Sequence, residues 1–203
     1  MTAVPRRKLT EVEYLAIENA AEFKSEFYNG IMYPLHRDEL TGMAGGSRFH
    51  NRVKDNIAIR IGGLLFDRPC ETYTSDLRVR LSLSGMYAYP DVVIVCDPPE
   101  FSDIDKNTLV NPQIVFEVLS PSTELYDRGF KFAQYRQQPT LKEYILVAQD
   151  AVRIERYVRQ SDNSWLLTVF DDPTGEFVLA TTPASLRMSE IYRGVEFPSE
   201  SIP

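Results

Sequence analysis

Residues 89–95 read YPDVVIV, and residues 112–119 read PQIVFEVL. Continuous apolar runs of this kind are typical of central strands covered on both faces. Each run carries one carboxylate where an apolar residue is expected, because Asp91 opens the first run and Glu117 interrupts the second. Residues 97–111 between them hold two prolines and several acids, which favours a loop. The two runs therefore predict neighbouring strands that bring two acids together near their ends.

The rest of the chain alternates between helix and strand patterns. Thr10 and Glu13 form a capping-box pattern that predicts a short helix to about Asn19. Asn-Gly at 29–30 predicts a hairpin over 26–33. Apolar spacing predicts a helix over 49–64, and alternation predicts one half-buried strand over 72–82 with Arg78 on its polar face. A further helix, capped by Ser122, is expected to run to about residue 137, followed by strands over 143–148, 152–158 and 165–170 and a helical turn in the tail.

This order of elements predicts an α/β fold, or α+β under stricter bookkeeping, with a central mixed sheet flanked by at least two helices. The chain has 203 residues, 43% of them hydrophobic, which is enough for one sizeable core. We therefore expect a single domain over residues 1–203.

Charge and hydropathy exclude some classes of protein. The net charge of −7 argues against a protein that coats nucleic acid through bulk positive charge. It does not exclude a nuclease, because a metal-binding cleft is itself acidic. No apolar run approaches the ~20 residues of a membrane span, and the first residues lack the apolar stretch of a signal peptide. We expect a cytoplasmic protein with no membrane partner.

Cys70 and Cys96 are the only cysteines, and no CxxC pair is present. Both lie in or beside apolar sequence, so we expect two buried thiols in a reducing compartment. Only His36 and His50 could complete a cysteine–histidine zinc site, which makes such a site improbable.

The two acids and one lysine indicate the chemistry. A buried Glu117 is costly unless it is paired, protonated or bound to a metal, although it could also reach solvent or an arginine. Asp91 could equally be a strand-start residue. Together, on adjacent strands, the two carboxylates can hold one magnesium ion. Lys131 shares a helix face with Asp127 and Tyr135. It could form a surface ion pair with Asp127, or its ammonium group could neutralise a transition-state phosphate.

Several motifs together resemble the Uma-two family of restriction endonucleases, in the PD-(D/E)XK nuclease-like superfamily. They are Pro-Asp at 90–91, EVLSPST at 117–123, D-R-x-x-K-x-x-x-Y at 127–135 and KEYILV at 142–147. The segments at 25–30, 45–50 and 74–79 fit as well, so the resemblance covers roughly Leu9 to Val158. It implies a restriction-endonuclease-like core and metal ligation by Asp91, Glu117 and the backbone carbonyl of Val118. It also implies Mg²⁺ or Mn²⁺ as cofactor.

One position departs from the superfamily pattern. The usual lysine two residues after the glutamate is Leu119 here. The resemblance implies that Lys131 replaces it from the helix, as a long flexible side chain allows. Glu26 is the candidate for an additional acid that orients water or binds a second metal, with a solvated hairpin residue as the alternative. His50 could contact phosphate or transfer a proton, or could be structural.

The leading hypothesis is a metal-dependent DNA endonuclease, with DNA as partner. A homodimer is expected by analogy, because two active sites cut both strands together. One alternative is a catalytically inactive module that binds nucleic acid or protein, which Leu119 and the acidic charge favour. Another is a carboxylate-pair glycosidase, for which Trp165 is the only tryptophan available as a sugar platform. Arg128, Arg136 and Lys142 are candidates for a DNA-facing rim.

Overall fold

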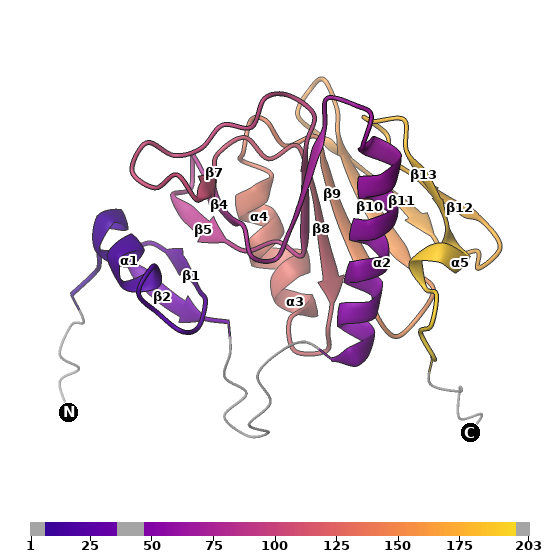
Figure 1. Ribbon diagram of the computed structural model, residues 1–203, viewed down its shortest axis with the longest axis horizontal. Helices are drawn as coiled ribbons and strands as arrows, with labels where there is room; N and C mark the ends of the chain where they lie inside the picture. The colour runs from indigo at the N-terminus through magenta and orange to yellow at the C-terminus, as the bar shows by residue number, and fades with distance from the viewer. Residues whose placement is uncertain (1–6, 36–46, 198–203) are drawn as a thin grey trace.

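The computed structural model describes residues 7–35 and 47–197 (Figure 1). Its centre is a six-stranded sheet in the order β11-β10-β9-β8-β6-β3. The strands are β3 (Glu71–Thr74), β6 (Val92–Val95), β8 (Ile114–Leu119), β9 (Glu143–Ala148), β10 (Ile154–Arg159) and β11 (Trp165–Phe170). β8 and β9 pair in parallel, whereas the other neighbours pair antiparallel. The predicted fold class is confirmed.

Helix α2 (Arg48–Leu65) covers one face of this sheet. Its apolar residues recur every fourth position and are fully buried against the sheet, where they form one core with β6, β8 and β9 (Val53, Ile57, Ile61, Leu65). β12 (Glu176–Val178), β13 (Ser185–Arg187) and α5 (Met188–Ile191) complete this layer. The predicted α2 helix and the helical turn of the tail are both present.

The opposite face carries a second sheet and a helical segment. The second sheet has the order β2-β1-β5-β4-β7. Its strands are β1 (Ser25–Tyr28), β2 (Ile31–Pro34), β4 (Arg78–Leu81), β5 (Met86–Ala88) and β7 (Thr108–Leu109). Helix α1 (Glu11–Glu18) packs on this sheet through Tyr14, which contacts Phe27 and Tyr87. The layer places the hairpin residues of β1 beside the central sheet.

The local N-terminal predictions are confirmed. Glu13 N–H donates to Thr10 Oγ1 at 3.2 Å, and Thr10 N–H donates to Glu13 Oε2 at 2.9 Å, which completes the capping box. Asn29 and Gly30 have φ values of 51° and 84°, as a tight hairpin requires. A side chain at position 30 would also meet Lys8, since an added Cβ would lie 2.5 Å from the lysine Cβ.

The prediction of one strand over 72–82 is wrong. A turn after Thr74, with Leu77 N–H donating to Thr74 O at 2.9 Å, carries the chain from β3 in the central sheet to β4 in the second sheet. Arg78 is only 4% exposed, not on a solvent face, because it forms a buried ion pair with Asp105. Alternation alone cannot reveal a change of sheet.

The helix after residue 121 is not one regular α-helix. It divides into α3 (Glu124–Tyr126), the π-helical turn η1 (Asp127–Lys131) and α4 (Phe132–Tyr135). Phe132 N–H donates to the carbonyl of Asp127, five residues earlier. The N-cap is Thr123, without a side-chain hydrogen bond, so the predicted Ser122 cap is wrong. Single π turns inside helices recur at functional sites.

Cys70 and Cys96 form a disulfide, so the prediction of two free thiols is wrong. Glu71 lies opposite Val95 in the β3–β6 register, which puts the two flanking cysteines opposite each other. Strand pairing of this kind is invisible in the spacing of two cysteines. His36 lies outside the described residues. Across the described ranges, no helix has the length and apolarity to cross a membrane.

Candidate active site

The register of β6 and β8 brings Asp91 and Glu117 together. Val92 lies opposite Phe116 in this register. Asp91 precedes Val92 and Glu117 follows Phe116, so the two acids form the next antiparallel pair. Strand alternation gives both acids the face shared by Val93 and Leu119, which pack in the core beneath the second sheet. Val118 N–H donates to Asp91 Oδ2 at 2.8 Å, which fixes that carboxylate against β8.

Lys131 reaches this pair from the π-helical turn. Its Nζ lies 2.8 Å from Glu117 Oε1, 3.4 Å from Glu26 Oε1 and 3.6 Å from Asp127 Oδ1. The side chains of this cluster are buried, and that of Lys131 is only 6% exposed. Leu119 lies in the apolar core, and the Lys131 amine reaches the acids from the helical segment. The structure therefore brings Glu26, Asp91, Glu117 and Lys131 into one cluster.

Glu26 belongs to this cluster and not to a solvated hairpin. It is only 2% exposed, on β1 of the second sheet. Tyr126 OH donates to Glu26 Oε2 at 2.6 Å, while Oε1 faces the Lys131 amine. The sequence favours a packing role for Tyr126 and does not predict this contact, because nothing in a helical tyrosine indicates a carboxylate partner a hundred residues away. The second sheet thus helps to hold the lysine in position.

The cluster contains more acids than bases. Burial raises the pKa of Glu117 well above its usual range, and the attraction of Lys131, which Asp127 and Asp91 oppose, does not offset it. Burial also lowers the pKa of Lys131, but Glu117, Glu26 and Asp127 outweigh it and hold that pKa well above its usual value. These shifts favour the protonated amine and also favour neutralisation of Glu117, by a proton or by a cation.

Asp91 and His50 form the accessible end of the cluster. Their side chains are 14% and 17% exposed, and His50 Nε2 lies 3.0 Å from Asp91 Oδ1. Although burial raises the pKa of Asp91, the hydrogen bonds from His50 and Val118 N–H lower it below its usual value. His50 is positioned by the start of α2, where its N–H donates to Ser47 Oγ at 3.0 Å.

The donor set fits a hard divalent cation. Carboxylate oxygens are the ligands that Mg²⁺ prefers, and Mg²⁺ keeps several waters, so it binds through one or two protein carboxylates. Glu117 Oε1 and Glu26 Oε1 are buried and accept no aligned hydrogen bond within the described residues, since their contacts with Lys131 are ion pairs. No cluster of three or more His, Cys, Asp or Glu side chains is arranged as a metal site in residues 7–35 and 47–197. Asp91 and Glu117 offer two carboxylates on neighbouring strands, within the number that Mg²⁺ takes from a protein.

Arg128 is engaged in ion pairs within the fold, so it is not a free cation on a DNA-facing rim. It forms ion pairs with Glu124 at 2.7 Å and with Glu155, so its charge is already used within the fold. The expectation that it faces DNA is not supported by these contacts.

This arrangement of a mixed sheet, paired strand-end acids and a lysine is the restriction-endonuclease-like class of fold. The model of the Uma2 family, described as "Putative restriction endonuclease", matches residues 12–189, and the chain belongs to this family. The family resemblance noted in the sequence is confirmed.

Relatives extend this finding. The chain is 37% identical over 168 residues to the uncharacterized protein sll1609 of Synechocystis sp., covering 83% of this chain and 90% of that protein. It is 33% identical over 195 residues to the uncharacterized protein slr1290 of the same organism, covering 96% and 97%. A crystal structure from Anabaena variabilis, described as a putative nuclease of the DUF820 family, superposes with a TM-score of 0.68 at 17% identity. It covers 89% of this chain and 95% of that chain, which shows a common fold.

Proposed function

We propose that this protein is a metal-dependent endonuclease that hydrolyses phosphodiester bonds in DNA. The observation that carries the proposal is the pairing of Asp91 with Glu117 across β6 and β8, with the Lys131 amine 2.8 Å from Glu117. Family and fold support a nuclease. The metal, the DNA substrate and the roles of individual residues are inferred from the chemistry of this cluster.

Asp91 and Glu117, with the backbone carbonyl of Val118, would hold Mg²⁺ or Mn²⁺. When bound, such an ion polarises the phosphate and lowers the pKa of an attacking water. Four carboxyl groups around one lysine support this assignment, because a bound cation could replace the proton that burial favours on Glu117 (Glu26, Asp91, Glu117 and Asp127). A core of uncharged side chains at this position would not attract a cation.

Lys131 would stabilise the charge that develops on the phosphate or position the attacking water. Its amine is protonated and is fixed by carboxylates on β1, β8 and η1, so it needs little reorganisation during the reaction. Water would attack phosphorus in line and expel the 3′ oxygen. Glu26 acts through the lysine and is a positioning residue in this scheme. His50, at the exposed end, contacts Asp91 Oδ1 through its Nε2 and would position that carboxylate.

Plasmid nicking tests the proposal. Wild-type protein in Mg²⁺ or Mn²⁺ should convert supercoiled plasmid to the nicked form, and EDTA should stop the reaction. Asp91→Asn and Glu117→Gln, which keep side-chain size, should each reduce the rate by about 100-fold or more. Asp103→Asn is the matched control, because that aspartate is fully exposed in the β6–β7 connection and pairs with nearby Lys106. Equal background nicking by all four proteins would refute the nuclease assignment.

The same preparation separates the alternatives. A non-catalytic binding module would retain plasmid DNA in a mobility-shift assay while nicking it in neither metal. The homodimer expected by analogy is tested by light scattering after size-exclusion chromatography, with and without DNA. A monomer that nicks one strand would contradict the paired-site mechanism but leave the single-site chemistry intact.

A further inference from the structure

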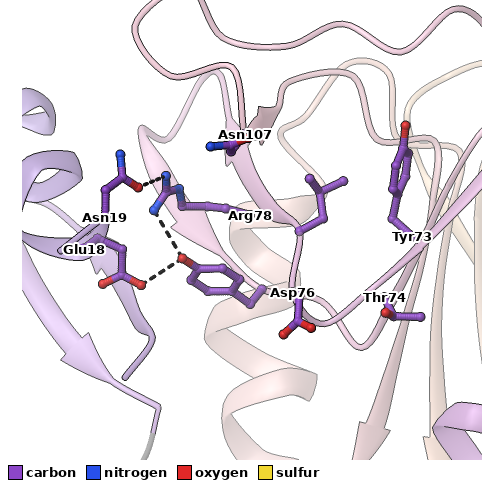
Figure 2. A pocket seen from close by; sticks show the side chains of 9 residues that line it. Glu18, Asn19, Tyr73, Thr74, Asp76, Arg78 and Asn107 are labelled. Carbon is purple, nitrogen blue, oxygen red and sulfur yellow. Dashed lines mark hydrogen bonds between the residues drawn. The ribbon is translucent and has the colours of Figure 1, made fainter. Parts of the chain in front are cut away.

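A concave site that includes no residue of the acidic cluster lies near the start of β6. A cleft of about 500 Å³ opens between the end of α1, the β3–β4 turn and the segment leading into β6. Figure 2 shows Glu18 and Asn19 at one end, Tyr73 at the other and Asn107 above. The catalytic proposal uses none of these residues.

The backbone connects this cleft directly to Asp91. Tyr89 lines the cleft and precedes Asp91 by two residues. Thr74, also in the lining, lies opposite Val92, the residue after Asp91, in the β3–β6 register. A polymer with one phosphate at Asp91 can therefore place an adjoining unit in the cleft.

Two lysines stand at the turn between the cleft and Asp91. Lys24 Nζ donates to Ser75 O at 2.9 Å, and Lys54 Nζ donates to Ser75 Oγ at 3.4 Å. Lys24 also lies 5.5 Å from the centre of the Tyr89 ring and pairs with Asp76. Lys54 also pairs with Asp55 at 3.7 Å, so each ammonium group has one carboxylate neighbour, which a backbone phosphate would have to replace.

The cleft itself is built for an uncharged ring and not for a phosphate. Arg78 is the guanidinium in its lining, and its donors are already taken by Thr108 Oγ1 at 2.9 Å, Asn19 Oδ1 at 2.9 Å and Asp105. Tyr73 and Leu77 are partly exposed and supply apolar surface. Aromatic rings of this kind stack on nucleobases regardless of sequence.

Glu18 supplies an acceptor for such a ring. Its Oε1 accepts from Ser25 N–H and from Tyr89 OH, both at 2.8 Å. Its Oε2 is buried and has no hydrogen-bond partner within the described residues. This unpaired acceptor is costly, and a small rotation of the Glu18 side chain toward the cleft would let an N–H of a nucleobase satisfy it.

We propose that the cleft receives an unpaired nucleobase adjoining the cleaved phosphodiester, while Lys24 and Lys54 hold the neighbouring backbone. This inference rests on the proposed function, since it takes DNA as the substrate. A base inside a duplex must first leave its stack, which costs a few kcal/mol. The protein therefore binds single-stranded or locally unpaired DNA more tightly than duplex DNA.

Photo-crosslinking in EDTA tests the site without requiring cleavage. A single-stranded oligonucleotide carrying 5-iododeoxyuridine, irradiated with the full-length protein, should crosslink to Tyr73 or Tyr89, as mapped by mass spectrometry. Fluorescence anisotropy should give tighter binding of the single strand than of the matching duplex. Tyr73→Leu should weaken single-strand binding by about 5- to 150-fold, the range for loss of one base–aromatic stack. Tyr73→Phe should recover most of that loss because it keeps the ring.

Tyr33→Leu is the matched control, because that tyrosine is exposed on β2 and is not in the cleft. Crosslinks confined to other segments, or a Tyr73→Leu variant that binds both DNA forms like wild type, would overturn the cleft assignment. If plasmid nicking depends on Asp91 while the cleft results fail, the nuclease proposal stands alone. If the crosslinks appear but no metal supports nicking, the cleft stands and catalysis does not.

Discussion

Replacement of Lys131 by methionine removes the only amine that faces Glu26, Glu117 and Asp127 in the described cluster. Methionine has nearly the length of the lysine stem, so the variant creates little cavity and changes mainly the charge. The acids then share a buried space without their counter-ion. Both the folded state and the proposed reaction should respond to this change.

The expected loss of stability can be worked from these contacts. The amine lies 2.8 to 3.6 Å from three carboxylates, and its side chain is 6% exposed, so solvent screens it little. Removing one partner of a buried ion pair costs about 3–5 kcal/mol. For a chain of 203 residues, each kcal/mol lowers the melting temperature by about 2–4 °C. Lys131→Met should therefore melt about 6–20 °C below wild type.

The loss should depend on pH in a defined direction. The folded-state pKa of Glu117 is raised, so the folded protein holds a proton there more readily than the unfolded chain. That contribution is present below the usual glutamate pKa of 4.5 and is lost as pH rises through the raised value. Without the lysine, protonation is the remaining way to neutralise the acid. The difference in melting temperature between variant and wild type should be larger at pH 8 than at pH 5.

Calorimetry of four proteins measures this coupling: wild type, Lys131→Met, Glu117→Gln and the double variant. The double variant should be more stable than the sum of the single losses predicts, by at least about 1 kcal/mol, because it removes charge and counter-charge together. In the nicking assay, Lys131→Met should be about 100- to 1,000-fold slower than wild type. Additive losses, or a Lys131→Met protein as stable as wild type at both pH values, would refute the reasoning about this cluster.

Three further outcomes are expected from the rest of the fold. Asp105→Ala should cost about 3–5 kcal/mol in chemical denaturation, because Arg78 keeps a buried charge without its partner; an unchanged midpoint would contradict this. Glu11→Gln should cost about 1 kcal/mol at pH 7 and progressively less as pH falls below 4.5. Burial raises the pKa of Glu11, but its hydrogen bonds with Arg80 and Tyr87 lower it below 4.5, so its stabilisation is lost as pH falls through the lowered value. A pH-independent loss would count against this reasoning. Reduction should lower stability by about 3.5 kcal/mol, since Cys70 and Cys96 close a loop of 26 residues, and a double serine variant should not respond to reductant.

Much of the central sheet could be predicted from the sequence. The apolar runs of β6 and β8 are continuous, and the acids in them are conspicuous against that background. The family motifs also pointed to Lys131 as the source of the missing charge. The Cys70–Cys96 bridge and the turn between β3 and β4 could not be predicted, because both depend on which strands pair and in which sheet. The alternation of apolar and polar residues indicates the two faces of a strand, but it does not indicate which strands pair with it.

Local sequence determined which strands are central, where the first helix and hairpin form, and that Asp91 and Glu117 stand out among apolar neighbours. Those features depend on residues close together in the chain. Only the tertiary structure decided that Glu26, from the second sheet, contacts the buried Lys131. It also decided that the cleft near Asp91 includes Glu18, whose Oε2 has no hydrogen-bond partner within the described residues. These contacts join segments far apart in sequence, and their chemistry depends on burial, which exists only after the sheets have packed.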